Sequence, residues 1–135
     1  MSSAFMHARS AMIVGGLLLL DGCGSDDDPV GPPNDLSPCT GPVSVTISSG
    51  STPTFSWTPA CTIQFLIVEE NASDRWDLTA LDGRGIAPGV RYGVVPAGAR
   101  QSDPPIPLAA GKMHEVALYK GLSFADLIAV GSFTP

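Results

Sequence analysis

Apolar and polar residues alternate in short segments from residue 42 to the end of the chain. In the segment 43–48, VSVTIS, Val, Val and Ile alternate with Ser and Thr. Successive side chains of a strand point to opposite faces, so a period of two predicts strands with one buried face. Similar segments follow, separated by turn sequences such as NASD and LDGRG: 53–59, 62–70, 75–81, 90–95, 114–121 and 127–133. The sequence therefore predicts an all-β domain, a single antiparallel β-sandwich of about seven strands, over residues 42–135.

The alternation also predicts which side chains share a face of each strand. Phe55 and Trp57 fall on the same face of the segment 53–59. The stretch 123–127, SFADL, is predicted to form a single helical turn and no longer helix. In the segment 62–70 the pattern divides the apolar residues into Ile63, Phe65 and Ile67 on one side and Leu66 and Val68 on the other.

The composition of the chain limits its size class and its partners. A length of 135 residues allows one ordinary domain, and 44% hydrophobic against 15% charged residues allows a packed core. The 15 glycines and 13 prolines favour many turns over long helices. The net charge is −6, and the seven Lys and Arg residues are scattered rather than grouped. We therefore expect no nucleic-acid partner.

An apolar run lies near the N-terminus. Residues 11–20 are all apolar or glycine, and Asp21 ends the run. Ten helical residues span about 15 Å, half of the ~30 Å hydrocarbon core, so the run is too short to be an ordinary membrane span. It has the size of a signal-peptide hydrophobic region, and the preceding residues carry Arg9 and no acid. We expect residues 1–22 to be a signal peptide; a buried core helix is the alternative.

The sequence LDGC, Leu20–Cys23, resembles the bacterial lipobox, although Asp21 stands where that family has a small uncharged residue. The resemblance implies cleavage before Cys23, lipidation of its thiol and acylation of the new amino terminus. Two or three acyl chains anchor a protein stably to a membrane. We expect an exported protein of the bacterial cell envelope, and Gly24 after the cysteine favours the outer membrane. Ordinary secretion with Cys23 as a spare thiol is the alternative.

Residues 23–41 are expected to form a lipidated cysteine followed by a flexible acidic and proline-rich tether. The run 26–28 holds three consecutive aspartates, which repel one another and favour a solvated spacer over a calcium loop. Fully extended, residues 24–38 would reach roughly 50 Å. Such a tether is long enough to hold a domain clear of a membrane surface.

The chain has three cysteines. If Cys23 is lipidated, Cys39 and Cys61 form an even pair in an oxidising compartment, and we expect a disulfide between them. A zinc site is the rival explanation, but His7 and His114 are the only histidines and His7 would leave with the signal peptide. We expect no metal and no cofactor.

Two stretches resemble a fibronectin type III domain. In PTFSWTPA, Trp57 is followed by Phe65 at about the interval that separates a Trp on strand B from an aromatic residue on strand C in that family. The stretch LAAGKMHEVAL is similar to the E–F corner, with Leu108, Val116 and Leu118 as its apolar positions. His114 occupies the family's tyrosine position, from which an imidazole could donate to a nearby carbonyl. The resemblance covers roughly residues 42–135 and implies a β-sandwich.

Catalytic motifs are not evident in the sequence. No nucleophile elbow, phosphate-binding loop or dinucleotide fingerprint occurs. A nucleophile needs a positioned base, and His114, within a predicted strand, is expected to be structural. Glu69 and Glu70 are neighbours on a strand, so they point to opposite faces and are expected to end that strand in solvent. The sequence NAS at 71–73 is typical of a turn.

Two functions from different classes are compatible with this sequence. The first is a non-catalytic binding or spacer module that is attached to the membrane through its lipid and that contacts an envelope protein or glycan. Aromatic binding candidates for it are Trp76, Tyr92 and Tyr119, if they prove exposed rather than core. The alternative is a small carbohydrate-active or hydrolytic accessory enzyme, which requires a cleft lined by carboxylates. Its candidates are Glu69, Asp74, Asp77 and Asp82.

Overall fold

The computed structural model describes residues 36–81 and 83–135. The expected signal peptide 1–22, Cys23, most of the tether and Asp82 lie outside the described residues. Among the described residues, no helix has both the length and the apolar character that a membrane crossing requires.

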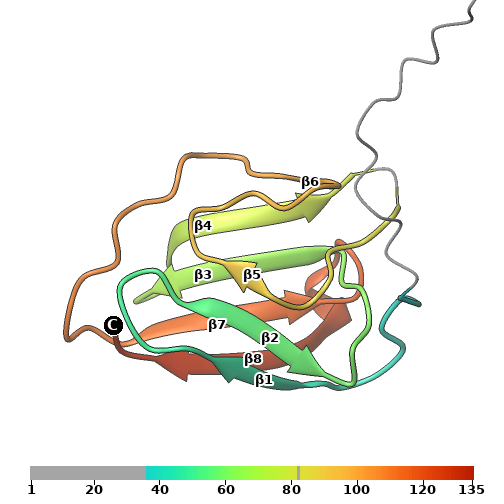
Figure 1. Cartoon of the computed structure of the whole chain (residues 1–135), viewed down its shortest axis with the longest axis horizontal. Helices are drawn as coiled ribbons and strands as arrows, with labels where there is room; N and C mark the ends of the chain where they lie inside the picture. The colour runs from blue at the N-terminus through green and yellow to red at the C-terminus, as the bar shows by residue number, and fades with distance from the viewer. Residues whose placement is uncertain (1–35, 82) are drawn as a thin grey trace, which may run out of the picture. The chain divides into compact units, whose positions relative to one another are not determined.

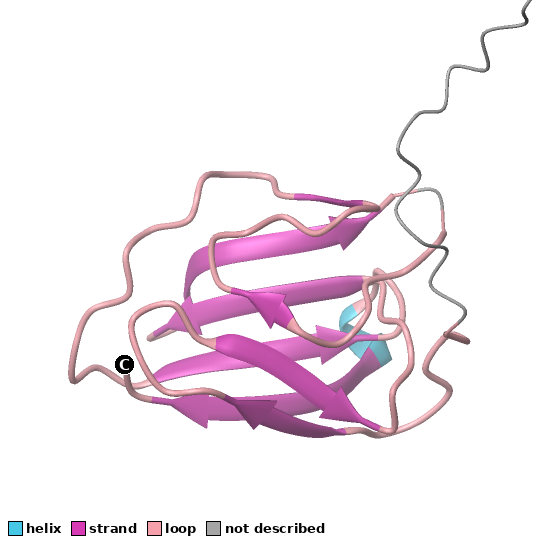
Figure 2. Ribbon diagram, viewed as in Figure 1, coloured by secondary structure: helices cyan, strands magenta, loops and turns pink. Residues whose placement is uncertain are grey.

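The described chain forms two antiparallel sheets packed face to face, as shown in Figures 1 and 2. Strands β1 (Ser44–Ile47), β2 (Thr54–Thr58) and β5 (Val90–Arg91) form the smaller sheet in the order β1-β2-β5. The larger sheet has the order β6-β4-β3-β7-β8, and its strands are β3 (Phe65–Glu70), β4 (Ser73–Ala80), β6 (Ala99–Arg100), β7 (His114–Tyr119) and β8 (Leu127–Phe133). The predicted antiparallel β-sandwich is confirmed.

The observed β5 and β6 differ from the predicted strands. Strand β6 was not predicted, because two residues are too few to show an alternation. Strand β5 ends at Arg91 instead of continuing to residue 95, because the chain turns at Gly93, whose φ is +79°. The predicted helical turn is present as η1 (Phe124–Asp126), a single 3-10 turn. The predicted turn at 71–73 is also present, with positive φ at Asn71 and Ala72.

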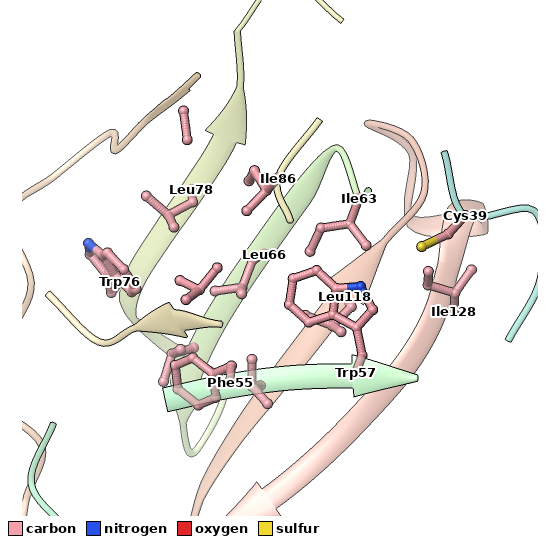
Figure 3. Packing of buried hydrophobic residues seen from close by; sticks show 14 of the residues in the cluster. Cys39, Phe55, Trp57, Ile63, Leu66, Trp76, Leu78, Ile86, Leu118 and Ile128 are labelled. Carbon is pink, nitrogen blue, oxygen red and sulfur yellow. The ribbon is translucent and has the colours of Figure 1, made fainter. Parts of the chain in front are cut away.

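The hydrophobic core lies between the two sheets. Phe55 and Trp57 reach into it from β2 and meet inward residues of the larger sheet, among them Leu66 and Leu118 (Figure 3). Ile63 is also fully buried in this core. The prediction that it shares a side with Phe65 is therefore wrong. Residues 62–64 precede β3, and Ile63 pairs instead with Ile86 in an isolated bridge, so the alternation of β3 does not extend to it.

A disulfide between Cys39 and Cys61 ties the N-terminal segment to the sandwich. Pro38 forms a parallel bridge with Thr62 beside it, and the Trp57 Nε1–H donates to the Cys61 carbonyl at 2.8 Å. The bond joins residues 22 apart in sequence. The predicted disulfide is confirmed, and it fixes the start of the described chain to one end of the sandwich.

The edges of the larger sheet are both partly covered. On one edge, β1 approaches β8 so closely that a Cβ on Gly131 would lie 2.9 Å from Ile47 Cδ1. The Val43 N–H also donates to the Ile128 carbonyl at 3.3 Å. On the other edge, β6 covers only the end of β4, and the chain after it returns alongside, with the Ile106 N–H donating to the Arg75 carbonyl.

Candidate functional site

Most of the residues singled out for the resemblance lie in the core. Phe55, Trp57, Val116 and Leu118 are all buried there. Leu108 is half-buried and packs against the core from the loop before β7.

Phe65, which was also singled out for the resemblance, lies outside the core. It projects from the opposite side of β3, half-buried against Tyr119, with the two ring centroids 5.5 Å apart. It does not belong to the hydrophobic core cluster. The reason is register: Phe65 is the neighbour of the inward-facing Leu66, so the pleat turns it outward.

A polar group is enclosed at the inner side of the larger sheet. The register between β3 and β4 shifts after Val68, so Arg75 is an extra residue on β4. Its Nη2 lies 3.0 Å from the Glu70 Oε2. The same carboxylate oxygen lies 3.3 Å from the Nε2 of His114, whose side chain is fully buried. The expectation that Glu70 ends its strand in solvent is therefore wrong, because the bulge supplies it with a cation.

The proton of His114 can be placed from its neighbours. Its Nδ1 lies 3.0 Å from the Lys112 carbonyl oxygen, which only accepts, so Nδ1 carries a proton and donates. Nε2 has no hydrogen-bond partner among the described residues, since its approach to Glu70 lies outside hydrogen-bond geometry. The imidazole also stacks on Phe133 at 5.5 Å. This environment fixes the ring between β7 and β8 and gives it a structural role.

Two of the aromatic binding candidates belong to the core rather than to the surface. Trp76 and Tyr92 pack edge to face at 5.2 Å, and both are buried. The Trp76 Nε1–H donates to Gln101 Oε1 at 2.9 Å, and the Tyr92 hydroxyl lies 2.5 Å from the Ile106 carbonyl oxygen. Burial raises the pKa of Tyr92 to about 12, although Arg75 acts in the opposite direction. Neither ring is available to a ligand in this conformation.

The outer face of the larger sheet carries a band of apolar residues. We call it the outer stripe; it consists of Phe65, Ile67, Ala117, Tyr119 and Val130. Phe65 and Ile67 stand opposite Tyr119 and Ala117 in the register, and Ala117 stands opposite Val130. Tyr119 is largely covered by its aromatic neighbours, whereas Val130 is 52% exposed. Ala117 is also buried, so the accessible apolar area of the stripe comes from Val130 and from the half-buried Phe65 and Ile67.

Three carboxylates adjoin the outer stripe at one end. Glu69 stands opposite Asp74 on β4 and opposite Glu115 on β7. Burial raises the pKa of Glu69, and the negative charge of Asp74, a hydrogen bond with Asp74 and the charge of Glu115 raise it further. The pKa of Tyr119 is also raised, chiefly by burial and then by Glu69. Like charges face one another here, which is unfavourable unless a cation or a proton is near.

The carboxylates proposed for a hydrolytic site are distributed along β3 and β4. Glu69 and Asp74 come together on the open outer face, while Asp77 accepts a hydrogen bond from the Ser102 hydroxyl at 2.7 Å. A shallow hollow of about 470 Å³ lies elsewhere, lined by residues 36–43 and 59–61. That hollow contains none of these side chains. Among the described residues, no three His, Cys, Asp or Glu side chains are grouped as metal ligands would be.

The sequence did not predict the ion pair between Glu70 and Arg75. It also did not predict that Glu115 lies beside Glu69 on the outer face. The bulge that brings Arg75 to Glu70 leaves no sequence signal. Glu115 could have been found, because it alternates with the inward-facing Val116 in the predicted strand 114–121.

Comparisons with known proteins place no relative beside this chain: no protein-family model, no curated protein and no solved structure matches it.

Proposed function

We propose that this chain is an exported lipoprotein of the bacterial cell envelope, anchored through Cys23, whose β-sandwich is a non-catalytic binding or spacer module. The outer face of the larger sheet is its binding surface for an envelope protein or glycan. The observation that carries the binding role is the outer stripe, with three carboxylates at its end. The fold does not need apolar residues there, since the core is already closed on the other side of the sheet.

The disulfide supports the proposed location. The bond uses two of the three cysteines of the chain, Cys39 and Cys61, and the third is Cys23. Structural disulfides persist in exported proteins and are rare in reducing compartments. A cysteine left over directly after an apolar run fits an acylation site.

The strand order supports the resemblance to fibronectin type III domains. A three-stranded sheet of order β1-β2-β5 packs on a larger sheet in which β4, β3, β7 and β8 are neighbours. Domains of this architecture host many functions, so the fold by itself selects none of them. The step to binding rests on the outer face.

Cell fractionation tests the anchor. We expect the wild-type protein in the membrane fraction with a fatty acid on Cys23, and the C23A variant in the soluble fraction. Two or more acyl chains give stable membrane binding, and their removal abolishes it. A C39A/C61A variant keeps Cys23 and serves as the control, which should remain on membranes. Unchanged membrane binding of C23A would contradict the anchor.

Site-specific photo-crosslinking tests the binding surface. A photoreactive residue replaces Ile67 on the outer stripe in one variant and the exposed Thr46 on the smaller sheet in the other. In intact cells we expect discrete crosslinked products from position 67 and none from position 46. Equal yields from both positions, or none from position 67, would argue for a pure spacer instead of a binding module.

A further inference from the structure

A small apolar projection lies between β7 and β8. We call it the knob; it consists of Leu122, Phe124 and Leu127, which are 77%, 87% and 45% exposed. Three large apolar side chains within six residues are thus presented to solvent, and none of them belongs to the core cluster. Exposure on this scale is a feature of interaction surfaces rather than of an ordinary turn.

The knob has a defined shape. Ser123 caps η1, its hydroxyl accepting from the Ala125 N–H at 3.3 Å, while Asp126 accepts from the Ser123 N–H at 3.2 Å. The Lys120 N–H donates to the Asp126 carbonyl at 2.9 Å. The Phe124 ring meets the edge of Tyr119 at 6.2 Å. The carboxylate of Asp126 is therefore engaged at its own cap, and the apolar side chains are held outward.

The knob lies at the end of the sandwich where the described chain begins. Pro38 bridges Thr62, and two residues later the Gln64 N–H donates to the Tyr119 carbonyl at the start of the knob loop. Figure 2 shows η1 at the same end as the first described residues, with the C-terminus at the opposite end. The first described residues therefore lie at the same end of the domain as the knob.

The charges of the described residues are distributed unequally between the two ends. Lys120 directly precedes the knob. The exposed Arg100 lies at the same end of the strands but on the opposite edge of the larger sheet, since it pairs with Thr79, the partner of Phe65. The carboxylates Glu69 and Glu115 lie at the far end of the same strands. The knob thus has Lys120 beside it and is kept apart from the acidic cluster of Glu69, Asp74 and Glu115.

We propose that the knob inserts into the headgroup region of the bilayer that holds the acyl chains on Cys23; this rests on the proposed function, because the anchor supplies the bilayer. Exposed Leu and Phe beside a Lys favour a membrane interface, and anionic headgroups attract the Lys120 cation. Twelve residues separate Cys23 from Leu36. Thirteen steps of chain reach roughly 45 Å at most, so the tether permits contact and does not enforce it. Insertion would orient the strands along the membrane normal. The outer stripe would then face parallel to the membrane surface.

Quenching by brominated lipids tests this orientation. The full lipidated chain is reconstituted into phosphatidylethanolamine–phosphatidylglycerol vesicles whose acyl chains carry bromine. The variants F124W and M113W each add one indole, at the knob and at an exposed site near the opposite end of β7. The natural Trp57 and Trp76 are buried and give both variants the same background. We expect bromine to quench the added emission of F124W about twofold or more and that of M113W hardly at all.

Each outcome bears on one of the two proposals. Equal quenching of F124W and M113W, or no quenching of F124W while Cys23 carries lipid, overturns knob insertion and leaves the anchor standing. Shielding of F124W from acrylamide in cell envelopes without quenching by brominated lipid assigns the knob to a protein partner and also overturns insertion. If mass analysis finds no lipid on Cys23, the proposed anchor fails. The full-length C23S chain, mixed with the same vesicles at high lipid concentration, then decides insertion independently by whether F124W is quenched.

A second pair of variants guards against a change in fold. L122D/F124D places two charges on the knob, and L122A/F124A removes apolar area without adding charge. Both sites are exposed, so neither pair should alter the unfolding transition. We expect vesicle binding of the C23S chain to fall roughly tenfold or more with the aspartates and less with the alanines.

Discussion

The two faces of the larger sheet are built from alternate residues of the same strands, yet they follow different rules. On the inner face, Leu66, Val68, Val116 and Leu118 are fully buried. On the outer face, apolar residues lie beside three carboxylates, and Val130 remains half exposed. Packing between the sheets dictates the inner residues, whereas no second sheet of the described chain covers the outer ones. The contrast separates what this sequence needs in order to fold from what it carries in addition.

The charged groups show the same contrast. The inner carboxylate of Glu70 has Arg75 at 3.0 Å and a histidine close by. The outer carboxylate of Glu69 has Asp74 and Glu115 opposite it in the register, and burial, followed by these two neighbours, raises its pKa. Neighbouring residues on one strand thus sit in opposite electrostatic environments. An unneutralised cluster at a surface suits a cationic group on a partner.

The largest difference between the faces is expected from two aromatic truncations. Trp57→Ala should lower the free energy of unfolding by about 3–5 kcal/mol, because it empties a core site and removes the hydrogen bond to Cys61. Phe65→Ala on the outer face should cost about 1 kcal/mol or less, since that ring is only half-buried. Denaturation in urea, followed by far-ultraviolet circular dichroism, measures both. Equal losses would erase the distinction between the faces.

Removal of the disulfide is expected to have the next largest effect. The C39A/C61A variant should lose about 3 kcal/mol, since the bond closes a loop between residues 22 apart and restricts the unfolded chain. The wild-type protein under reducing conditions should lose a similar amount, and reduction should leave the variant unchanged. Thermal denaturation with and without reductant compares them. An unaltered transition would mean that the core alone holds the N-terminal segment.

A moderate effect is expected at Tyr92, which belongs to the inner side. Tyr92→Phe should cost about 1 kcal/mol, because the Ile106 carbonyl loses its donor. The folded-state pKa of about 12 lies above the ordinary value of 10.0. The protonated hydroxyl therefore contributes stability that is complete below pH 10 and is lost between about pH 10 and 12. Ultraviolet titration should show ionisation of Tyr92 near pH 10 only after unfolding. Ionisation of both tyrosines near pH 10 in the folded protein would refute this.

The smallest effect, and the one of opposite sign, is expected at Glu69. Its raised pKa means that the folded state holds the proton more tightly than the unfolded state, so stability falls as pH rises above 4.5 through the folded value. Glu69→Gln should remove this loss and raise stability at pH 7 by up to about 0.5 kcal/mol. Glu70→Gln, the control on the next residue, should lower it because Arg75 loses its partner. The free energy of unfolding of both variants, measured at pH 4 and pH 7, distinguishes the effect of Glu69→Gln from that of Glu70→Gln.

The alternation of apolar residues was sufficient to predict the sandwich and most of its strands. It succeeded for β2 and β7, where one face is buried along the whole strand, and the cysteine count predicted the disulfide. It failed at Ile63 and Phe65, because periodicity does not show where a strand begins. A strand start one residue away reverses which side chains face the core.

The candidate site was less predictable than the fold. The bulge that supplies Arg75 to Glu70 depends on tertiary register, which no local pattern records. The outer stripe and the knob required a knowledge of which faces remain uncovered. Leu122 and Phe124 are apolar residues in a loop, and sequence alone cannot distinguish them from core residues.

With the proposed membrane anchor, the partly covered edges of the larger sheet bear on how neighbouring copies interact. Open strand edges pair with one another, and anchoring in two dimensions raises the frequency of such encounters. Here β1 lies against β8 where Gly131 permits close contact, and β6 is two residues long with the chain returning beside β4. Each edge strand is therefore covered over part of its length by another segment of the described chain. This partial cover leaves fewer free backbone groups and so disfavours edge-to-edge pairing between copies.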